Sequence, residues 1–248
     1  MNATMRHLLV FGGTSDVGYA VARAYASAGW DVTLAVRDAK KGARNTRDLN
    51  TRYGVSARLY QFDVCAPAEE CDWIDLIEPL PDTAICVVGL LGDQRRGERD
   101  ELHAQEILRT NMEGPCLLLG RIANRMEARG SGTIIGISSV AGERGRASNY
   151  LYGAGKAGFT AFLSGLRHRL ANKGVQVVTV KLGFARTRMT AGMPLPRLLT
   201  AEPQEVGSAI YRAAELRKRE VVYLRPIWRP IMAVITHLPE PIFKRLSI

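Results

Sequence analysis

The sequence predicts an α/β protein: a doubly wound parallel sheet with helices on both faces, in a single domain. Its 248 residues are enough for one such domain with a buried core. With 46% hydrophobic and 23% charged residues, its composition is that of an ordinary globular protein. Short apolar segments alternate with helical ones along most of the chain, and this alternation is typical of parallel sheets.

Six segments are predicted to be strands. Each is a short, nearly continuous run of apolar and β-branched residues, as expected of strands that are buried on both faces. They are His7–Phe11, Val32–Val36, Ala57–Phe62, Ala84–Val88, Gly132–Ser138 and Val175–Leu182.

Helices are predicted between these strands, because apolar residues recur there every three or four positions. They are Gly18–Ala28, Ala39–Tyr53, Glu98–Asn111, Glu113–Arg129 and Tyr152–Asn172. After Thr187 we expect a loop or short helices over Met189–Leu199, and then a helix from about Glu202 to Lys218. Residues 188–220 are the expected substrate region, since such sheets bind ligands beyond the carboxyl ends of their strands.

The chain is basic, with 34 Lys and Arg against 24 Asp and Glu, a net charge of +10. Eight basic and three acidic residues fall within residues 212–248, so much of the surplus lies near the C-terminus. Such a surplus attracts phosphates, nucleic acid or an anionic membrane. The sequence has no recognition-helix or base-stacking pattern, so we expect no nucleic-acid partner.

Residues 221–248 form an apolar and basic C-terminal segment. The aromatic residues Tyr223, Trp228 and Phe243 alternate there with basic residues around an apolar run, Ile231–Ile235. Two interpretations stay open: the segment rests at the headgroup interface of a membrane, or it packs on the substrate region or on a second subunit. Its longest apolar stretch, Ile227–Leu238, is too short to span about 30 Å of hydrocarbon.

The four cysteines show no metal-binding or disulfide pattern. Cys65, Cys71, Cys86 and Cys116 include no C-x-x-C pair, and the four histidines are scattered, so we expect reduced core thiols and no metal. The N-terminal residues 1–7 do not resemble a secretory signal. We therefore expect a cytoplasmic protein, peripheral to the inner face of the membrane if the C-terminal segment binds lipid.

A glycine-rich turn follows the first predicted strand. It reads Gly12-Gly13-Thr14-Ser15-Asp16-Val17-Gly18 and leads directly into a helix. Glycines let the backbone approach a pyrophosphate, whose charge is favoured by the free N–H groups at a helix start. Asp16 stands at the middle position of the three-glycine fingerprint, so the match is partial. The turn predicts a nucleotide site; the alternative is a turn that serves packing alone.

Tyr152 and Lys156 are four residues apart at the start of a predicted helix and share one face. An ammonium beside a phenol lowers the phenol's pKa, so the tyrosine can exchange a proton near neutrality. Ser139, at the end of a predicted strand, can reach the same pocket, and Asn111 stands where a helix is interrupted. The alternative for the Tyr152 pair is a solvated helix face.

With these residues in place, the chain resembles the classical short-chain dehydrogenases/reductases. The glycine turn, Asp63-Val64, Asn111, the strand end at Ser139 and Tyr152-x-x-x-Lys156 follow the family's order and spacing. The resemblance implies a Rossmann-type fold and an NAD(P)-dependent oxidoreductase. It also implies four catalytic roles: Tyr152 protonates the carbonyl oxygen, Lys156 holds the nicotinamide ribose and lowers the tyrosine pKa, Ser139 orients the carbonyl, and Asn111 supports a water in the proton relay.

The resemblance also implies cofactor contacts, with Asp63 at the adenine and Thr187 at the nicotinamide amide. The full implied set is Gly12, Thr14, Ser15, Asp16, Val17, Gly18, Arg37, Asp63, Val64, Gly89, Tyr152, Lys156 and Thr187. Two motifs depart from the family: Val88–Gly92 replaces Asn-Asn-Ala-Gly, and Leu182-Gly183 replaces Pro-Gly. The resemblance further implies that the helices in residues 98–129 and 152–172 pair between subunits, in a homodimer or homotetramer.

Arg37 favours NADPH as the cofactor. NAD-preferring relatives carry an acidic residue where Val36 stands, whereas Arg37 can pair with a 2′-phosphate. The nearby Asp38 leaves NADH as the alternative.

Several segments also resemble the decaprenylphosphoryl 2-keto-pentose reductases. They are Gly89–Asp93, Ser138–Arg144, Arg186–Met189, Leu238-Pro239 and Ile242–Leu246. This resemblance implies reduction of a lipid-linked keto-sugar on a polyprenyl phosphate. One alternative is the reduction of another hydrophobic ketone, acyl or steroid-like. A second is a nucleotide-sensing protein without turnover, but the presence of both Tyr152 and Lys156 argues against it.

Overall fold

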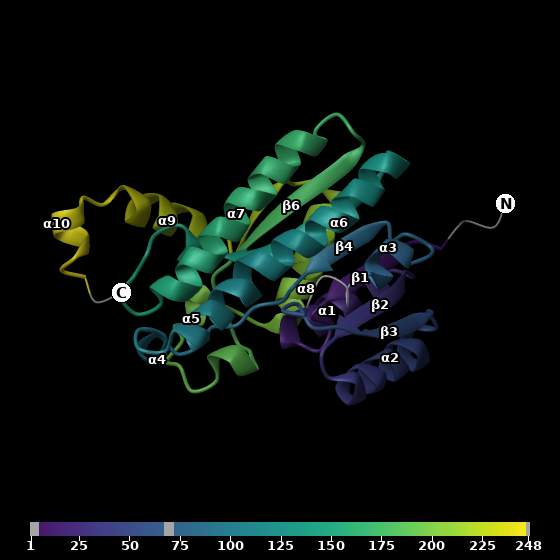
Figure 1. The fold of residues 1–248 in the computed structure, drawn as a ribbon, viewed down its shortest axis with the longest axis horizontal. Coiled ribbons are helices and arrows are strands. Elements are labelled where there is room, and N and C mark those ends of the chain that lie inside the picture. Colours follow the sequence, from purple (N-terminus) through teal and green to yellow (C-terminus); the bar gives the residue numbers. More distant parts are fainter. Residues whose placement is uncertain (1–4, 67–71, 247–248) are drawn as a thin grey trace.

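The computed structural model describes residues 5–66 and 72–246, and its centre is a seven-stranded sheet in which every neighbouring pair is parallel (Figure 1). The strand order is β3-β2-β1-β4-β5-β6-β9. The strands are β1 His7–Phe11, β2 Asp31–Val36, β3 Ala57–Gln61, β4 Thr83–Cys86, β5 Gly132–Ser139, β6 Val175–Leu182 and β9 Val221–Leu224. This is the order of a Rossmann-type domain, and it confirms the predicted fold class.

Helices cover both faces of the sheet (Figure 1). They are α1 Asp16–Ala26, α2 Ala39–Tyr53, α3 Trp73–Leu76, α4 Gln94–Gly97, α5 Glu101–Leu108, α6 Gly114–Arg129, α7 Tyr150–Leu170, α8 Pro203–Tyr211, α9 Trp228–His237 and α10 Glu240–Phe243. Alternate strand residues point to opposite faces. Leu8 and Val10 therefore pack with α1, α2 and α8, while Leu9 and Phe11 pack with α3, α6 and α7.

The predicted helix Glu98–Asn111 is wrong in its bounds. A separate short helix, α4, precedes the segment, α5 begins only at Glu101, and a π-helical turn over Arg109–Glu113 then runs into α6. The predicted helix Glu202–Lys218 likewise divides into α8 and a π-helical turn over Arg212–Leu216. A π-turn has about one residue more per turn than an α-helix, and a single such turn inside a helical run is too short to be recognised from apolar spacing.

The C-terminal segment contains a strand that the sequence analysis missed. β9 pairs with β6, with Thr179 opposite Val221 and Leu182 opposite Leu224, and closes one edge of the sheet. A second, two-stranded sheet pairs β7 Phe184–Ala185, just before the expected substrate region, with β8 Thr200–Ala201 inside it. The predicted strand Ala84–Val88 ends earlier than expected, at Cys86.

Three of the four cysteines lie within the described residues, and all three are free thiols. Cys86 is buried as expected, whereas Cys65 and Cys116 are half-buried. Cys71 lies outside the described residues. In residues 5–66 and 72–246, no helix is both long enough and apolar enough to cross a bilayer.

Candidate active site

The glycine turn joins β1 to α1 and is closed by Ser15. The Ser15 hydroxyl donates to the Gly12 carbonyl at 2.8 Å and accepts from the Gly18 N–H at 3.0 Å. Gly12 has φ +88°, in the left-handed region that favours glycine. A Cβ on Gly18 would overlap the Gly12 carbonyl oxygen. Glycine at these two positions is therefore what allows the turn to bring its backbone to the start of α1.

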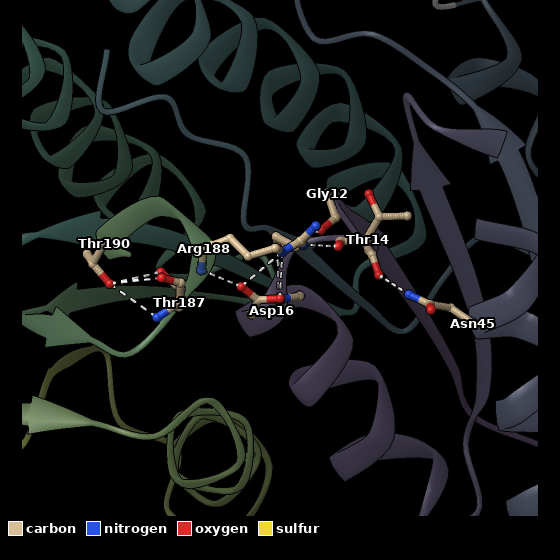
Figure 2. Close-up of polar contacts among 10 residues, drawn as sticks. Gly12, Thr14, Asp16, Asn45, Thr187, Arg188 and Thr190 are labelled. Carbon is tan, nitrogen blue, oxygen red and sulfur yellow. Dashed lines mark hydrogen bonds and ion pairs between the residues drawn. The ribbon is translucent and has the colours of Figure 1, made fainter. Parts of the chain in front are cut away.

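Arg188 fastens the segment after β7 to this turn (Figure 2). Its main-chain N–H donates to the Asp16 carboxylate at 2.7 Å, and its Nε donates to the same carboxylate at 3.0 Å. Its Nη2 donates to the Thr14 carbonyl at 2.7 Å. Asp16 stands where the three-glycine fingerprint has its middle glycine. Its carboxylate binds Arg188, which lies 172 residues further along the chain.

Ser139, Tyr152 and Lys156 all line one cavity of about 300 Å³ at the carboxyl ends of the strands. Ser139 is the last residue of β5, and its hydroxyl donates to the Leu182 carbonyl at 3.2 Å and accepts from the Ala141 N–H at 3.1 Å. Tyr152 lies in the first turn of α7, and Lys156 follows one turn later. The structure therefore gathers three of the four predicted catalytic residues.

Lys156 is almost completely buried, with 3% of its surface exposed. Its ammonium donates to the carbonyls of Val88 at 3.3 Å and Ile137 at 3.1 Å. No carboxylate among the described residues pairs with it, and burial lowers its pKa to about 8. An ammonium has three hydrogens, so one remains for a ligand in the cavity.

Tyr152 has a pKa above its usual value of 10, because burial disfavours the phenolate. Hydrogen bonding with Ser139 and the positive charge of Arg146 oppose this rise. Arg146 supplies the opposing charge here, where the sequence pointed to Lys156. The net result is a phenol that keeps its proton at neutral pH, as a proton donor must.

Asn111 occupies the middle of the π-helical turn and is fully buried. Its amide nitrogen donates to the carbonyls of Leu90 at 2.6 Å and Ile107 at 2.8 Å, and its oxygen accepts from the Leu90 N–H at 3.2 Å. A Cβ on Gly89 would lie 3.2 Å from this oxygen and 3.3 Å from the Lys156 ammonium. Asn111 thus positions the segment after β4 beside Lys156, although its side chain does not line the cavity.

The remaining predicted cofactor residues lie in two groups. Ser15, Asp16, Val17, Gly89 and Thr187 line the cavity. The others, Gly12, Thr14, Gly18, Arg37, Asp63 and Val64, do not line it and follow the neighbouring strands β1, β2 and β3. An Arg37 nitrogen lies 4.0 Å from an Asp63 carboxylate oxygen, and the Arg37 side chain is 82% exposed. That guanidinium is therefore accessible to a ligand phosphate.

The C-terminal segment provides one wall of the cavity. Trp228, at the start of α9, lines the cavity and donates from Nε1 to the Leu199 carbonyl at 3.1 Å. Together with Met232 it is buried against Val140. Trp228 and Met232 therefore pack on the domain, as one of the two interpretations of the C-terminal segment expects. Four other apolar residues of this segment are exposed, namely Ile227, Val234, Ile242 and Leu246.

Comparison with known proteins identifies the family. Residues 6–196 match the short chain dehydrogenase family. The chain belongs to this family. It is 35% identical over 242 residues to an uncharacterised oxidoreductase of Mycobacterium tuberculosis, with 96% of each chain covered. It is 26% identical over 222 residues to an acetoacetyl-CoA reductase of Allochromatium vinosum, covering 83% of this chain and 89% of that one.

A solved short-chain dehydrogenase from Sphingobium yanoikuyae, in complex with NADPH, has the same fold with a TM-score of 0.83. It is 21% identical to this chain, and the match covers 95% of this chain and 97% of that one. As a short-chain dehydrogenase, the present chain is an NAD(P)-dependent oxidoreductase.

Sequence reasoning on this short-chain dehydrogenase missed three features of the cavity. Arg146 and Asn149 line it from the turn before α7, and Trp228 lines it from α9. An arginine and an asparagine in a loop are ordinarily solvated, so their residue types carry no signal. Trp228 was noted as an aromatic of the tail, but its burial depends on contacts with residues far away in sequence.

Proposed function

We propose that this short-chain dehydrogenase reduces a ketone with NADPH and that Tyr152 donates the proton. The observation that carries the proposal is the meeting of Ser139, Tyr152 and Lys156 in one cavity. When bound, NADPH supplies a hydride to the carbonyl carbon and becomes NADP⁺. The Tyr152 hydroxyl gives its proton to the carbonyl oxygen, so the product is an alcohol.

The residues present fit such a cofactor. Ser15, Asp16 and Val17 bring the start of α1 to the cavity, where its free N–H groups favour the negative charge of a pyrophosphate. Lys156 keeps one ammonium hydrogen for a ribose hydroxyl. Arg37 would hold the 2′-phosphate, Asp63 the adenine and Thr187 the nicotinamide amide. NADH is the alternative cofactor.

Within the proposed reaction, Ser139 would orient the carbonyl by donating its hydroxyl hydrogen to the oxygen. Asn111 would hold the segment after β4 in place and support a water that returns a proton to Tyr152. The raised pKa of Tyr152 supports its role as an acid in the direction of reduction, since the phenol is protonated when the ketone arrives.

For the substrate we propose a lipid-linked keto-sugar on a polyprenyl phosphate. The cavity combines apolar walls, among them Phe184, Met193 and Trp228, with the basic residues Arg146 and Arg188. An isoprenoid chain would pack against the apolar walls, and a phosphate would bind the basic residues. The alternative is another hydrophobic ketone, and the acetoacetyl-CoA reductase similarity supports ketone reduction in general.

We further propose that the enzyme contacts the inner face of the membrane peripherally and forms a homodimer or homotetramer. Exposed apolar residues and exposed basic residues lie together on α9, α10 and their flanks. They are Ile227, Arg229, Val234, Ile242, Lys244, Arg245 and Leu246. Anionic lipid attracts such a mixture through both charge and apolar burial. Light scattering on the purified chain measures the oligomeric state.

The central experiment compares Tyr152→Phe with the wild-type enzyme in NADPH oxidation across a panel of ketones. The variant should lose at least about 100-fold in kcat, the usual contribution of a general acid, and keep its NADPH affinity within about twofold. Tyr150→Phe is the matched control, because Tyr150 is exposed on the same helix and does not line the cavity. Retained activity in Tyr152→Phe would remove this residue from the mechanism, and NADPH binding without oxidation of any ketone would favour a sensing protein.

A truncation tests the membrane contact. Deletion after Glu220 would remove β9 and the Trp228 wall, so it cannot separate membrane binding from folding. Deletion after Leu238 removes α10 and the basic residues that follow it but leaves both features in place. This variant should oxidise NADPH with a short soluble ketone at the wild-type rate while sedimenting less with vesicles of anionic lipid. Unchanged sedimentation would contradict the proposed contact.

A further inference from the structure

We propose that Arg146 and Asn149 form a subsite that binds a phosphate group of the substrate beside one of its sugar hydroxyls. The inference rests on the proposed function in one respect, namely that the cavity containing Tyr152 receives the substrate. It adds the residues that recognise the non-reacting part of that substrate.

The first observation is that Arg146 lines the cavity without a partner of its own. Its side chain is half-buried, and among the described residues its guanidinium makes no ion pair and no hydrogen bond. Its guanidinium interacts electrostatically with the phenol of Tyr152. A guanidinium carries five N–H donors and stays charged in proteins, so Arg146 has donors free for an anion in the cavity.

The other arginines nearby have partners, which sets Arg146 apart. Arg188, the second arginine of the cavity, is bound to Asp16 and Thr14. Arg144, two residues earlier, donates to the carbonyls of Ile235 and Leu238, both at 2.6 Å. It thereby ties the loop after β5 to the C-terminal segment. Of these three arginines, only Arg146 has no hydrogen-bond or ion-pair partner among the described residues.

The second observation is an unpaired acceptor next to Arg146. The Asn149 Oδ1 atom is buried and has no hydrogen-bond partner within residues 5–66 and 72–246. Asn149 stands at the N-cap of α7 but its side chain makes no capping hydrogen bond, and it lines the same cavity. Its main-chain N–H donates to the Arg146 carbonyl at 3.1 Å, so the two residues belong to one turn.

Together the two side chains specify complementary chemistry. Arg146 offers charged donors to an anion, and planar guanidinium donors match phosphate oxygens well. Asn149 offers a carbonyl oxygen that needs a donor, and a sugar hydroxyl supplies one. A carboxylate alone would satisfy Arg146 and leave Asn149 unpaired. A phosphorylated sugar satisfies both, and its phosphate is either linked to a lipid or free on a soluble sugar.

The test measures ligand binding by calorimetry with saturating NADP⁺, and it needs no turnover. The soluble pair is ribose 5-phosphate and ribose, and the lipid pair is farnesyl phosphate and farnesol. In the wild-type enzyme each phosphate should bind at least about 10-fold more tightly than its neutral partner, as expected of a charge-assisted contact. Tighter binding of farnesyl phosphate than of ribose 5-phosphate identifies the lipid-linked source, and the reverse order identifies the soluble one.

The variants assign this preference to residues. Arg146→Gln should weaken both phosphates by about 10- to 100-fold and leave the neutral ligands and NADP⁺ unchanged, and Arg146→Lys should recover part of the loss. Asn149→Leu should weaken ribose 5-phosphate more than farnesyl phosphate, which has no hydroxyl. Arg47→Gln, on the exposed side of α2, is the control and should match the wild type.

Any of the following results would overturn the subsite: no preference of the wild-type enzyme for phosphate, no measurable binding of either phosphate, or a preference that persists in Arg146→Gln. An equal loss of charged and neutral ligands in Arg146→Gln would also overturn it, because that pattern indicates a structural role. Failure of ketone reduction in the Tyr152 experiment would leave these binding measurements intact, so the two proposals fail separately.

Discussion

The indole ring of Trp228 occupies the space that a side chain on Gly183 would need. A Cβ on Gly183 would overlap three ring atoms of Trp228. Gly183 stands where the family more usually has the glycine of a Pro-Gly pair, and here it lets α9 lie against the end of β6. We predict that Gly183→Ala destabilises the protein by about 1–3 kcal/mol, the usual cost of overpacking. Urea denaturation measures this change.

A matched glycine gives the control for that prediction. Gly165 is exposed in the middle of α7, and nothing lies within 4 Å of the Cβ that alanine would add there. Gly165→Ala should be neutral or should stabilise the protein by about 0.5–1 kcal/mol, since alanine is the better helix former. Equal stability of the two variants would mean that α9 moves aside without cost.

The contact between Arg188 and Asp16 predicts an effect on cofactor release. The ion pair joins the segment after β7 to the turn that would hold the pyrophosphate, so its removal should free that segment. Arg188→Ala and Asp16→Ala should each speed NADPH dissociation, measured by stopped-flow fluorescence, by about two- to fivefold, because a partly exposed pair is weak. The double variant should be no faster than the single ones. Additive effects would show that the two side chains act independently.

Arg37 predicts the choice between the two nicotinamide cofactors. Arg37→Ala should weaken NADPH binding by about 10-fold, because a 2′-phosphate loses its charge-assisted partner. NADH has no such phosphate, so its dissociation constant should stay the same. Fluorescence titration with both cofactors measures the ratio of the two dissociation constants. Arg47→Ala serves as a control, because Arg47 is exposed on α2, the helix that follows Arg37. A parallel loss for both cofactors would contradict the assignment.

The buried Lys156 predicts the pH dependence of reduction. Its pKa of about 8 means that it carries its charge below that pH and loses it above. NADPH-dependent kcat/KM should therefore be nearly constant below pH 7 and should fall as the pH rises through about 8. The flat limb extends to neutrality because Tyr152, with its raised pKa, stays protonated throughout this range.

The same lysine affects stability with the opposite sign, which separates inactivation from unfolding. Its pKa is about 10.5 when unfolded and about 8 when folded, so the unfolded chain binds more protons between these values. The contribution of Lys156 to the free energy of unfolding must then increase with pH over that window. A melting curve at each pH tests this, and a fall in activity that tracks a fall in melting temperature would assign the pH effect to unfolding.

Local patterns were enough to predict most of the sheet and the three residues that line the cavity together. Apolar runs identified six strands because parallel strands are buried on both faces, and the Tyr152 and Lys156 spacing identified a helix face. The sequence analysis missed β9 because this edge strand has only four residues and its first residue, Val221, is exposed. The Arg188 contact with Asp16 and the Trp228 contact with Gly183 join distant segments, and no local pattern records them.

The hydrogen bonds from Arg144 to the end of α9 hold the C-terminal segment against the cavity, and this has a consequence for how the cavity can change. The proposed proton donor and its helpers all come from residues before 160, whereas the Trp228 wall comes from the last tenth of the chain. Exchanging that final stretch for one from another member of the family would reshape the cavity and leave the groups proposed for proton transfer as they are. One wall of the cavity is thus encoded apart from the groups proposed for proton transfer, and altering it would change the shape of the site while Arg146 and Asn149 stay in place.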